Sequence, residues 1–274
     1  MTGGSAHSAV GADGSGWLPV LAVVAVGGCY LAAAARGRRT ARGWRPTRTA
    51  AFVVGVGLLG VALSPVVASA AHHDARAHMV QHLLVGMYAP LALALAAPLT
   101  LALRTMPGPA RRHARAVLRS PVSHLLRHPV TALLLNVAGL YLIYLTPLYG
   151  TAKTNEILHL AIHAHVFAAG YLFTWSVAGP DPAPRRPGLG LRLAVVVLAA
   201  AAHAILAKLL YARAPHWPPG AAFDLDAARD AAQLMYYGGD LAELLLVVAL
   251  FTGWYRRSGR RAGPRASGIA APVG

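Results

Sequence analysis

The sequence predicts an all-α fold, a polytopic membrane helix bundle of about seven transmembrane helices with the N-terminus outside and the C-terminus in the cytoplasm. Of the 274 residues, 56% are hydrophobic and 12% charged, with a mean hydropathy of +0.50. Soluble proteins carry about 25% charged residues. Apolar stretches long enough to cross a bilayer recur along the chain, and arginines fill alternate segments between them.

Seven stretches have the length and composition of membrane spans. They cover residues 17–35, 50–71, 79–103, 129–149, 157–178, 191–212 and 231–254. The first lacks a preceding basic segment, so we expect a retained helix and not a signal peptide. The third contains Pro90 and Pro98, where we expect a kink and not a break, because neighbouring helices or waters can satisfy the freed carbonyls. The predicted organisation is an extracytoplasmic tail at 1–16, a seven-helix domain at 17–257 and a basic cytoplasmic tail at 258–274.

The placement of charge predicts the orientation of the bundle. Of the 25 lysines and arginines, 20 are arginines in the segments 36–49, 104–128, 179–192 and 255–274. Alternate segments share one face, which the excess of positive charge identifies as cytoplasmic. The opposite face, with loops 72–78, 150–156 and 213–230, is slightly acidic. The formal net charge of +16 therefore reflects membrane topology, and we expect no nucleic-acid partner.

Ionisable residues recur inside the outer halves of the predicted spans. They are the pairs His78 and His82 and His159 and His163, each spaced i,i+4, and, near the midplane, His203, Asp240 and Glu243. Each such group in the hydrocarbon costs at least about 2.5 kcal/mol, so it is expected to face a partner inside the bundle. The alternative for any one histidine is a hydrogen-bonded packing role. His72 and His73 are expected to be solvated loop residues.

The chemistry of these side chains favours copper. The single cysteine, Cys29, excludes an intramolecular disulfide and a multi-cysteine zinc site. Imidazole and thioether donors suit copper better than calcium or magnesium. The predicted ligands of Cu(I) are His78, Met79, His82, His159, His163, His203, Asp240 and Glu243.

Five blocks of the sequence resemble the CtaG-type cytochrome c oxidase assembly factors, over about residues 50–257. The blocks begin with HMVQHLLVGMYAPLALALAAPLTLALR (78–104) and HPVTALLLNVAGLYLIYLTPLYG (128–150), and continue with HLAIHAHVFAAGYLFTWSVAGPDPAPRR (159–186), RLAVVVLAAAAHAILAKLLYA (192–212) and MYYGGDLAELLL (235–246). By position, the family's motif residues fall on His78, Gln81, His82, His159, His163, His203, Asp240 and Glu243. The resemblance implies a role in maturing a haem-copper oxidase, at the step that supplies copper on the outer face of the bacterial cytoplasmic membrane.

We therefore expect a non-enzymatic assembly factor that binds copper at an outer-half histidine site and helps deliver it to an oxidase subunit. The expected partners are that subunit, on the outer face, and the lipid bilayer; an oligomer is compatible with the sequence. Two alternatives remain open: a copper transporter without a dedicated oxidase partner, and a b-haem electron-transfer protein. The sequence has no Walker motif, nucleophile elbow or HExxH string, which argues against hydrolase and nucleotide-driven chemistry.

Overall fold

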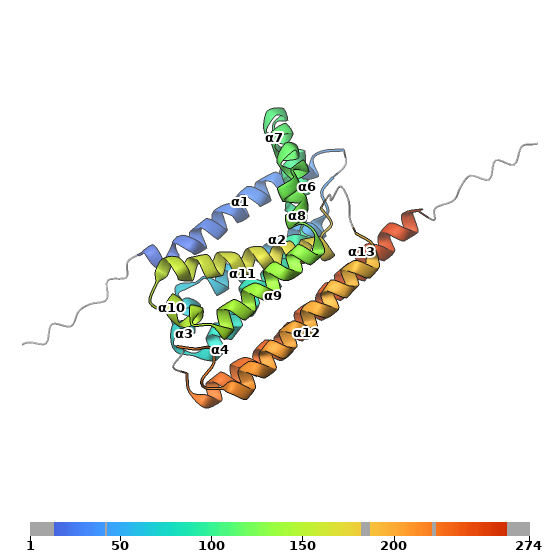
Figure 1. Cartoon of the computed structure of the whole chain (residues 1–274). Coiled ribbons are helices and arrows are strands. Elements are labelled where there is room, and N and C mark those ends of the chain that lie inside the picture. The colour runs from blue at the N-terminus through green and yellow to red at the C-terminus, as the bar shows by residue number, and fades with distance from the viewer. Residues whose placement is uncertain (1–13, 42, 182–186, 221–222, 262–274) are drawn as a thin grey trace, which may run out of the picture.

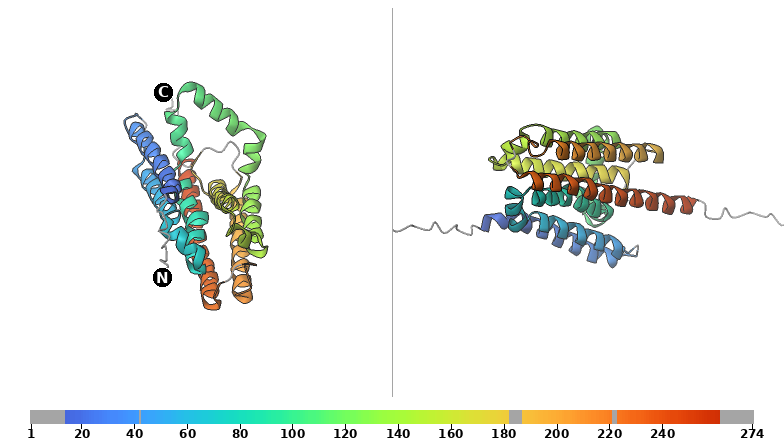
Figure 2. Two further views of the ribbon diagram at one scale, coloured as in Figure 1. Left: turned by 90° about the vertical axis from the view of Figure 1, so that its left-hand side faces the viewer. Right: turned by 90° about the horizontal axis from the view of Figure 1, so that it is seen from below.

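The computed structural model describes residues 14–41, 43–181, 187–220 and 223–261, and in these ranges all regular structure is helical (Figure 1). The helices lie side by side in a bundle, with α1 and α2 on one side and α9 and α12 on the other (Figure 2). The predicted all-α class is confirmed. Residues 1–13 and 262–274 of the two predicted tails lie outside the described residues.

Five helical runs are long and apolar enough to cross a membrane. They are α1 (Leu18–Arg38), the run Ala75–Leu95, α11 (Glu156–Val177), α12 (Leu189–Arg213) and α13 (Leu225–Arg261). A sixth arises if α2 (Pro46–Ala62) and α3 (Pro65–His73), which are bent by 52° at their junction, form one span. The apolar helix α9 (Pro129–Leu145) is shorter. Six of the predicted spans thus fall on one helix or on two consecutive helices, the third runs over α4, η2, α5 and a further helix, and the count of seven stays a prediction.

The third predicted span shows one expectation met and one that is wrong. At Pro90 the helix continues, as expected: α4 (Ala75–Leu83) passes through a π-helical turn, η2 (Leu84–Tyr88), into α5 (Ala89–Leu95). At Pro98 the helix breaks and does not merely kink. Ala97 adopts a left-handed conformation (φ 56°), and a separate helix α6 (Pro98–Thr105) begins there.

The start of α6 is held by Asp181, from the Gly-Pro-Asp-Pro string. The Asp181 carboxylate is 1% exposed. It accepts hydrogen bonds from the backbone N–H groups of Leu99 (3.2 Å) and Thr100 (2.7 Å) and from the Thr100 hydroxyl. The first N–H groups of a helix have no partner within it, and a carboxylate there also interacts favourably with the helix dipole. A residue far along the chain thus stabilises the break that Pro98 begins.

Glycines allow the helices that carry the site to approach closely. A Cβ added at Gly170 of α11 would overlap the carbonyl oxygen of Gly86 in η2. In α13, a Cβ at Gly238 would lie 2.5 Å from Leu83, and one at Gly239 would overlap the His203 imidazole. Small residues at such crossings let membrane helices pack backbone against side chain. Gly238 and Gly239 therefore allow α13 to pack closely against α4 and α12.

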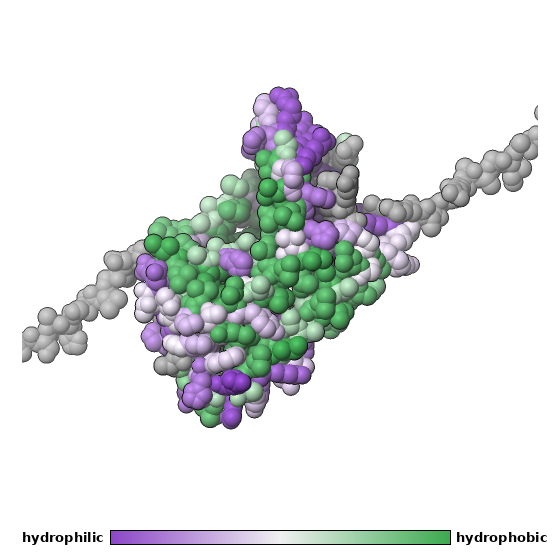
Figure 3. Space-filling model, in the orientation of Figure 1, coloured by the Kyte–Doolittle hydropathy of each residue, from purple (hydrophilic) through white to green (hydrophobic). Residues whose placement is uncertain are grey.

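Hydrophilic residues gather at the two ends of the bundle, and hydrophobic residues cover its middle (Figure 3). One end carries the amphipathic helix α7 (Gly108–Arg119) and the short α8 (Pro121–Leu126); we call it the arginine-rich end. The other carries α3, the first turn of α4, α10 (Leu148–Ala152) and the connection from α12 to α13; we call it the histidine-rich end. The short helix η1 (Gly14–Trp17) precedes α1.

Candidate functional site

Five histidines line one cavity near the histidine-rich end. The cavity has a volume of about 40 Å³, room for a few waters or one ion. Its histidines come from α3, α4 and α11 and are His72, His78, His82, His159 and His163. Tyr144, Tyr149, Gln81 and Lys153 complete its polar lining. We call this space the histidine cavity; it brings together four of the predicted copper ligands and one further histidine.

Three imidazoles are in ring contact within this cavity. The ring centroids of His159 and His163 are 4.3 Å apart, and those of His72 and His159 are 5.1 Å apart. Asn155 fixes the start of α11 by accepting the Leu158 N–H (3.0 Å), and the i,i+4 spacing then puts His159 and His163 on one face. The Nδ1–H of His163 can donate to the His159 carbonyl (3.0 Å), which leaves Nε2 as the unprotonated nitrogen, with its lone pair available to a ligand.

The two histidines of α4 are held against tyrosines. His78 Nε2 lies 3.2 Å from the Tyr144 hydroxyl, and its ring packs edge-on against Tyr149 with centroids 4.7 Å apart. The His82 ring packs edge-on against Tyr144 at 5.7 Å. His82 is 8% exposed, and its Nε2 atom has no hydrogen-bond partner among the described residues. Buried imidazole nitrogens usually have a hydrogen-bond partner, so the His82 Nε2 atom is available to a ligand.

A second cavity, deeper in the bundle, contains His203 and Glu243. It also measures about 40 Å³ and has Asn136, His165 and Thr174 in its lining; we call it the inner cavity. His203 Nδ1 lies 3.9 Å from the Glu243 carboxylate, and both side chains are at most 10% exposed. In the part of the chain that the structure describes, the His203 Nε2 atom, like that of His82, has no hydrogen-bond partner. His82 and Val166 line both cavities and separate them.

Two predicted ligands lie apart from these cavities. Met79 is 3% exposed and packs with Leu206 and Met235 in a hydrophobic cluster between α4, α12 and α13. Asp240 is exposed, although Glu243, three residues on, is buried. The predicted polar cluster therefore contains His203 and Glu243 without direct participation of Asp240. Within the described ranges, no three His, Cys, Asp or Glu side chains are already arranged to hold a metal ion.

Sequence reasoning missed the part played by His72. It was expected to be a solvated loop residue. His72 is exposed, as expected, but it lies in the last turn of α3, which extends to His73, and there it stacks on His159 and lines the histidine cavity. The helical signal was present: Ser64 caps the helix by accepting the Val67 N–H, and Pro65 occupies its first turn. Ser followed by Pro is a start signal for a new helix.

Gln81, the polar residue between the two histidines of α4, has a structural role. Its side-chain amide donates to the Ala62 carbonyl (2.8 Å). That carbonyl belongs to the last turn of α2, where the helix ends and carbonyls lack helical partners. Gln81 is 3% exposed, so this hydrogen bond ties the bend between α2 and α3 to the helix that carries His78 and His82.

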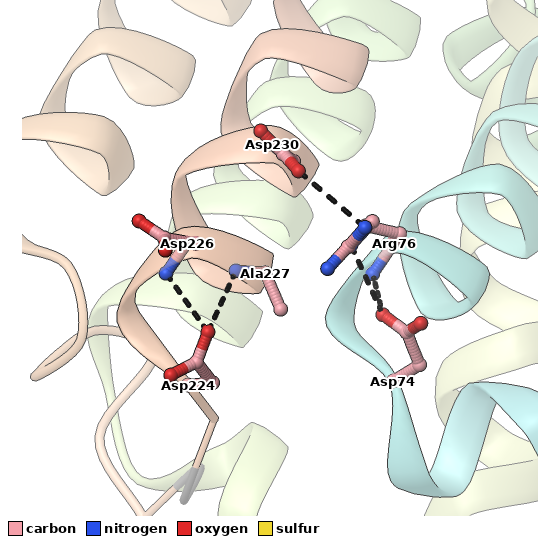
Figure 4. Close-up of polar contacts among 6 residues, drawn as sticks. All are labelled: Asp74, Arg76, Asp224, Asp226, Ala227 and Asp230. Carbon is pink, nitrogen blue, oxygen red and sulfur yellow. Dashed lines mark hydrogen bonds and ion pairs between the residues drawn. The ribbon is translucent and has the colours of Figure 1, made fainter.

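Acidic residues lie around the N-terminus of α13 at the histidine-rich end (Figure 4). Arg76 lies between Asp74 (3.8 Å) and Asp230 (3.6 Å), joining α4 to α13. The Asp224 carboxylate accepts the N–H groups of Asp226 and Ala227 and thereby caps α13. The Arg76, Asp74 and Asp230 side chains are about half exposed, so these ion pairs stabilise the fold only weakly. Among the described residues of this end, the acids exceed the lysines and arginines by one, so it is slightly acidic.

The sequence matches the family of cytochrome c oxidase caa3 assembly factors (Caa3_CtaG) over residues 28–257. The chain belongs to this family. The match covers every residue of both cavities, including those of α3 and α13. The family is described as one of cytochrome c oxidase caa3 assembly factors, and the apolar helices are those of a multi-pass membrane protein.

Among curated proteins, the chain is similar to three mycobacterial ones. It is 30% identical to uncharacterized protein ML1998 of Mycobacterium leprae over 250 residues, which is 84% of this chain and 38% of that protein. It is 32% identical over 141 residues to uncharacterized protein Mb0105 of Mycobacterium bovis and to uncharacterized protein MT0111 of Mycobacterium tuberculosis, covering 46% of this chain and 20% of theirs. The chain thus spans less than two fifths of the length of these relatives. No solved structure matches the chain.

Proposed function

We propose that this assembly factor binds Cu(I) in the histidine cavity and delivers it to a haem-copper oxidase subunit that docks at the histidine-rich end. The observation that carries the proposal is the convergence of five imidazoles on one small cavity, three of them in ring contact. Copper is the cargo and not a resident cofactor, and the role is non-catalytic.

The donor set fits this cargo. His72, His159 and His163 would supply the first imidazole nitrogens, and His82 offers a buried nitrogen without a hydrogen-bond partner. Neutral imidazole is a good copper ligand. Because no group of three is already arranged for a metal in the described ranges, binding would require rotation of the rings, and the cost of that rotation would weaken retention. Weak retention suits a protein that must release its ion.

The proposed orientation puts the histidine-rich end outside the bacterial plasma membrane. The arginine-rich segments favour the cytoplasmic side, and the acids at the opposite end, Asp74, Asp224, Asp226 and Asp230, would raise the local concentration of cations there. His203 and Glu243 in the inner cavity would balance the charge of the ion or take it further. Met79 and Asp240, which lie apart from the cavities, would contribute through the surrounding packing and electrostatics and not as direct ligands of the ion in the histidine cavity.

The test is a Cu(I) titration of the purified protein in liposomes, in competition with a coloured Cu(I) chelator. We expect the His159→Ala, His163→Ala double variant to weaken copper binding at least about tenfold, the scale on which changes at metal sites act. His113→Ala is the matched control, since His113 is exposed on α7 at the arginine-rich end. Undiminished copper binding in the double variant would overturn the assignment of the site.

Two further measurements separate the alternatives. An absorption spectrum of the same preparation would show a Soret band if the protein held b-type haem. The two cavities, of about 40 Å³ each, are too small for a haem unless the helices move apart. Copper uptake into vesicles that lack an oxidase would instead favour a transporter. Copper bound at one end without uptake, and released to an added oxidase subunit, is the result expected for delivery.

A further inference from the structure

Polar residues form a stripe on an exposed face of α13. Arg229, Gln233, Tyr237 and Asp240 follow one another at spacings of four, four and three residues, which puts them within one narrow arc of the helix. All four are exposed, and Tyr237 keeps 69% of its surface. The stripe runs from the histidine-rich end, where α13 begins, into the part of α13 that has the hydropathy of a membrane span. In a monomer, this face would contact lipid.

The neighbouring helix α12 adds a positive charge beside this stripe. Lys208 is exposed, and its Nζ atom lies 5.3 Å from the centre of the Tyr236 ring of α13. Between the two helices is an open groove of about 300 Å³, lined by Lys208, Tyr211, Gln233, Tyr236 and Tyr237 over the small residues Ala207 and Ala232. In the described part of the chain, no ion pair joins Lys208 to Asp240.

Two opposite charges on a lipid-facing surface require a partner. Ionisable groups at membrane depth are costly unless they face protein, water or each other. Lys208 of α12 lies beside Tyr236 of α13. One turn deeper, His203 of α12 contacts Gly239 of α13. Asp240, the next residue, therefore lies about one helical turn deeper than Lys208. Arg229, nearer the histidine-rich end, lies over the Tyr211 ring of its own chain at 5.5 Å. In the described structure, Lys208 and Asp240 form no ion pair with each other, so they leave one positive and one negative group on this face for a partner.

We propose that this face, defined by Lys208, Gln233, Tyr237 and Asp240, is the interface of a twofold-symmetric dimer with a second copy of this chain. In a twofold interface, residue i of one copy meets residue j of the other, and the reverse contact forms at the same time. Lys208 of each copy then pairs with Asp240 of the other. The exposed Tyr237 of each copy fills the groove of the other copy, whose floor is Ala207 and Ala232.

Self-complementary charge distinguishes a second copy from an unrelated helix. A surface that carries both an acid and a base is complementary to a second copy of the same surface. An unrelated partner would need a matching acid and base in the same order. Small residues in the groove floor allow the close approach that membrane helix contacts need. The proposal is independent of copper binding, because neither cavity contributes a residue to this face.

The experiment counts copies per particle in liposomes at decreasing ratios of protein to lipid. The lone cysteine, Cys29, is exposed on α1, and α1 packs against α2 and α6, so a fluorophore there leaves the proposed interface free. We expect two-step photobleaching for the unmodified chain. In Lys208→Asp and in Asp240→Lys, like charges meet, and the association should weaken at least about tenfold, the factor expected from two polar contacts between membrane helices.

Mixing the two variants gives the decisive result. A Lys208→Asp chain has two acids on this face and an Asp240→Lys chain has two bases, so each should remain monomeric alone while the mixture forms mixed dimers. Arg112→Asp, on α7 at the other end of the bundle, is the control and should dimerise normally. Single-step bleaching of the unmodified chain at all densities would overturn the proposal, as would unchanged dimers in either variant alone, or a mixture that stays monomeric. If a charge-reversed chain does not fold, Lys208→Gln and Asp240→Asn replace it, and undiminished dimers in both would overturn the proposal equally.

Discussion

Replacing Asp181 with alanine should loosen the start of α6. The carboxylate accepts two backbone N–H groups and one hydroxyl, from Leu99 and Thr100. Each donor left without a partner in a partly buried position costs about 1 kcal/mol, the low end of the range for buried groups. The loss of all three contacts should therefore lower the free energy of unfolding by about 3 kcal/mol. Asp181→Asn keeps one acceptor oxygen and should cost about 1 kcal/mol.

Thermal unfolding in detergent, followed by the loss of tryptophan signal, measures this effect. A loss of 3 kcal/mol corresponds to a decrease in Tm of about 6 to 12 °C for a chain of this size. Thr100→Val removes one of the three donors while keeping the shape of the side chain, so it should cost about 1 kcal/mol. In combination with Asp181→Ala, its effect should nearly disappear, because the hydroxyl no longer has its acceptor.

A result in which Asp181→Ala and the unmodified chain unfold within about 0.5 kcal/mol of each other, the scale of an ordinary surface substitution, would refute this reasoning. Full additivity of Asp181→Ala and Thr100→Val would refute the specific contact between them. The first outcome would mean that Pro98 and the left-handed Ala97 hold the break without help from the Gly-Pro-Asp-Pro segment.

Two other substitutions test the backbone and the close helix contact. Gly239→Ala puts a methyl group against His203 and should lower the unfolding free energy by about 1 to 3 kcal/mol, as overpacking does. Gly57→Ala is the control: a Cβ at Gly57 would have nothing within 4 Å, so this variant should be neutral or slightly stabilising. Equal Tm values for the two variants would contradict the contact between Gly239 and His203. Ala97→Gly relieves the positive φ of 56°, worth about 1 kcal/mol, but removes a methyl group that is fully buried, which costs about 0.8 kcal/mol. The two effects should nearly cancel, and a decrease in unfolding free energy of about 2 kcal/mol or more in the same assay would contradict this balance.

The sequence predicted the positions of the long helices well, because apolar length is a local property. The predicted spans at 157–178 and 191–212 differ from α11 and α12 by at most two residues at either end. The breaks were harder to predict. The bend after Ala62 depends on Gln81, which is 19 residues away, and the break at Pro98 depends on Asp181, more than 80 residues away. Contacts of this range leave no local signature beyond a proline.

The candidate site was predicted in its composition but not in its arrangement. Spacing alone put His159 and His163 on one face, and the structure brings them into ring contact. The spacing did not predict that Asp240 is exposed while Glu243 is buried. Membrane helices are apolar on all sides, so the sequence pattern does not identify the face that meets another helix. The same uncertainty applied to Met79, which faces the hydrophobic cluster of α12 and α13. The structure supplies the missing information through Gly239, which marks where α13 meets His203.

The close approach at Gly86 has a consequence for movement between the two cavities. A methyl group at this position would lie 2.8 Å from Val166 Cγ1 and 3.7 Å from His82 Cε1, and these two residues form the shared wall. Side-chain rotation is far faster than any shift of packed helices. Because Gly86 has no side chain, the shared wall packs directly on the backbone of η2, and rotation of His82 or Val166, not a shift of helices, is the movement that would change this wall.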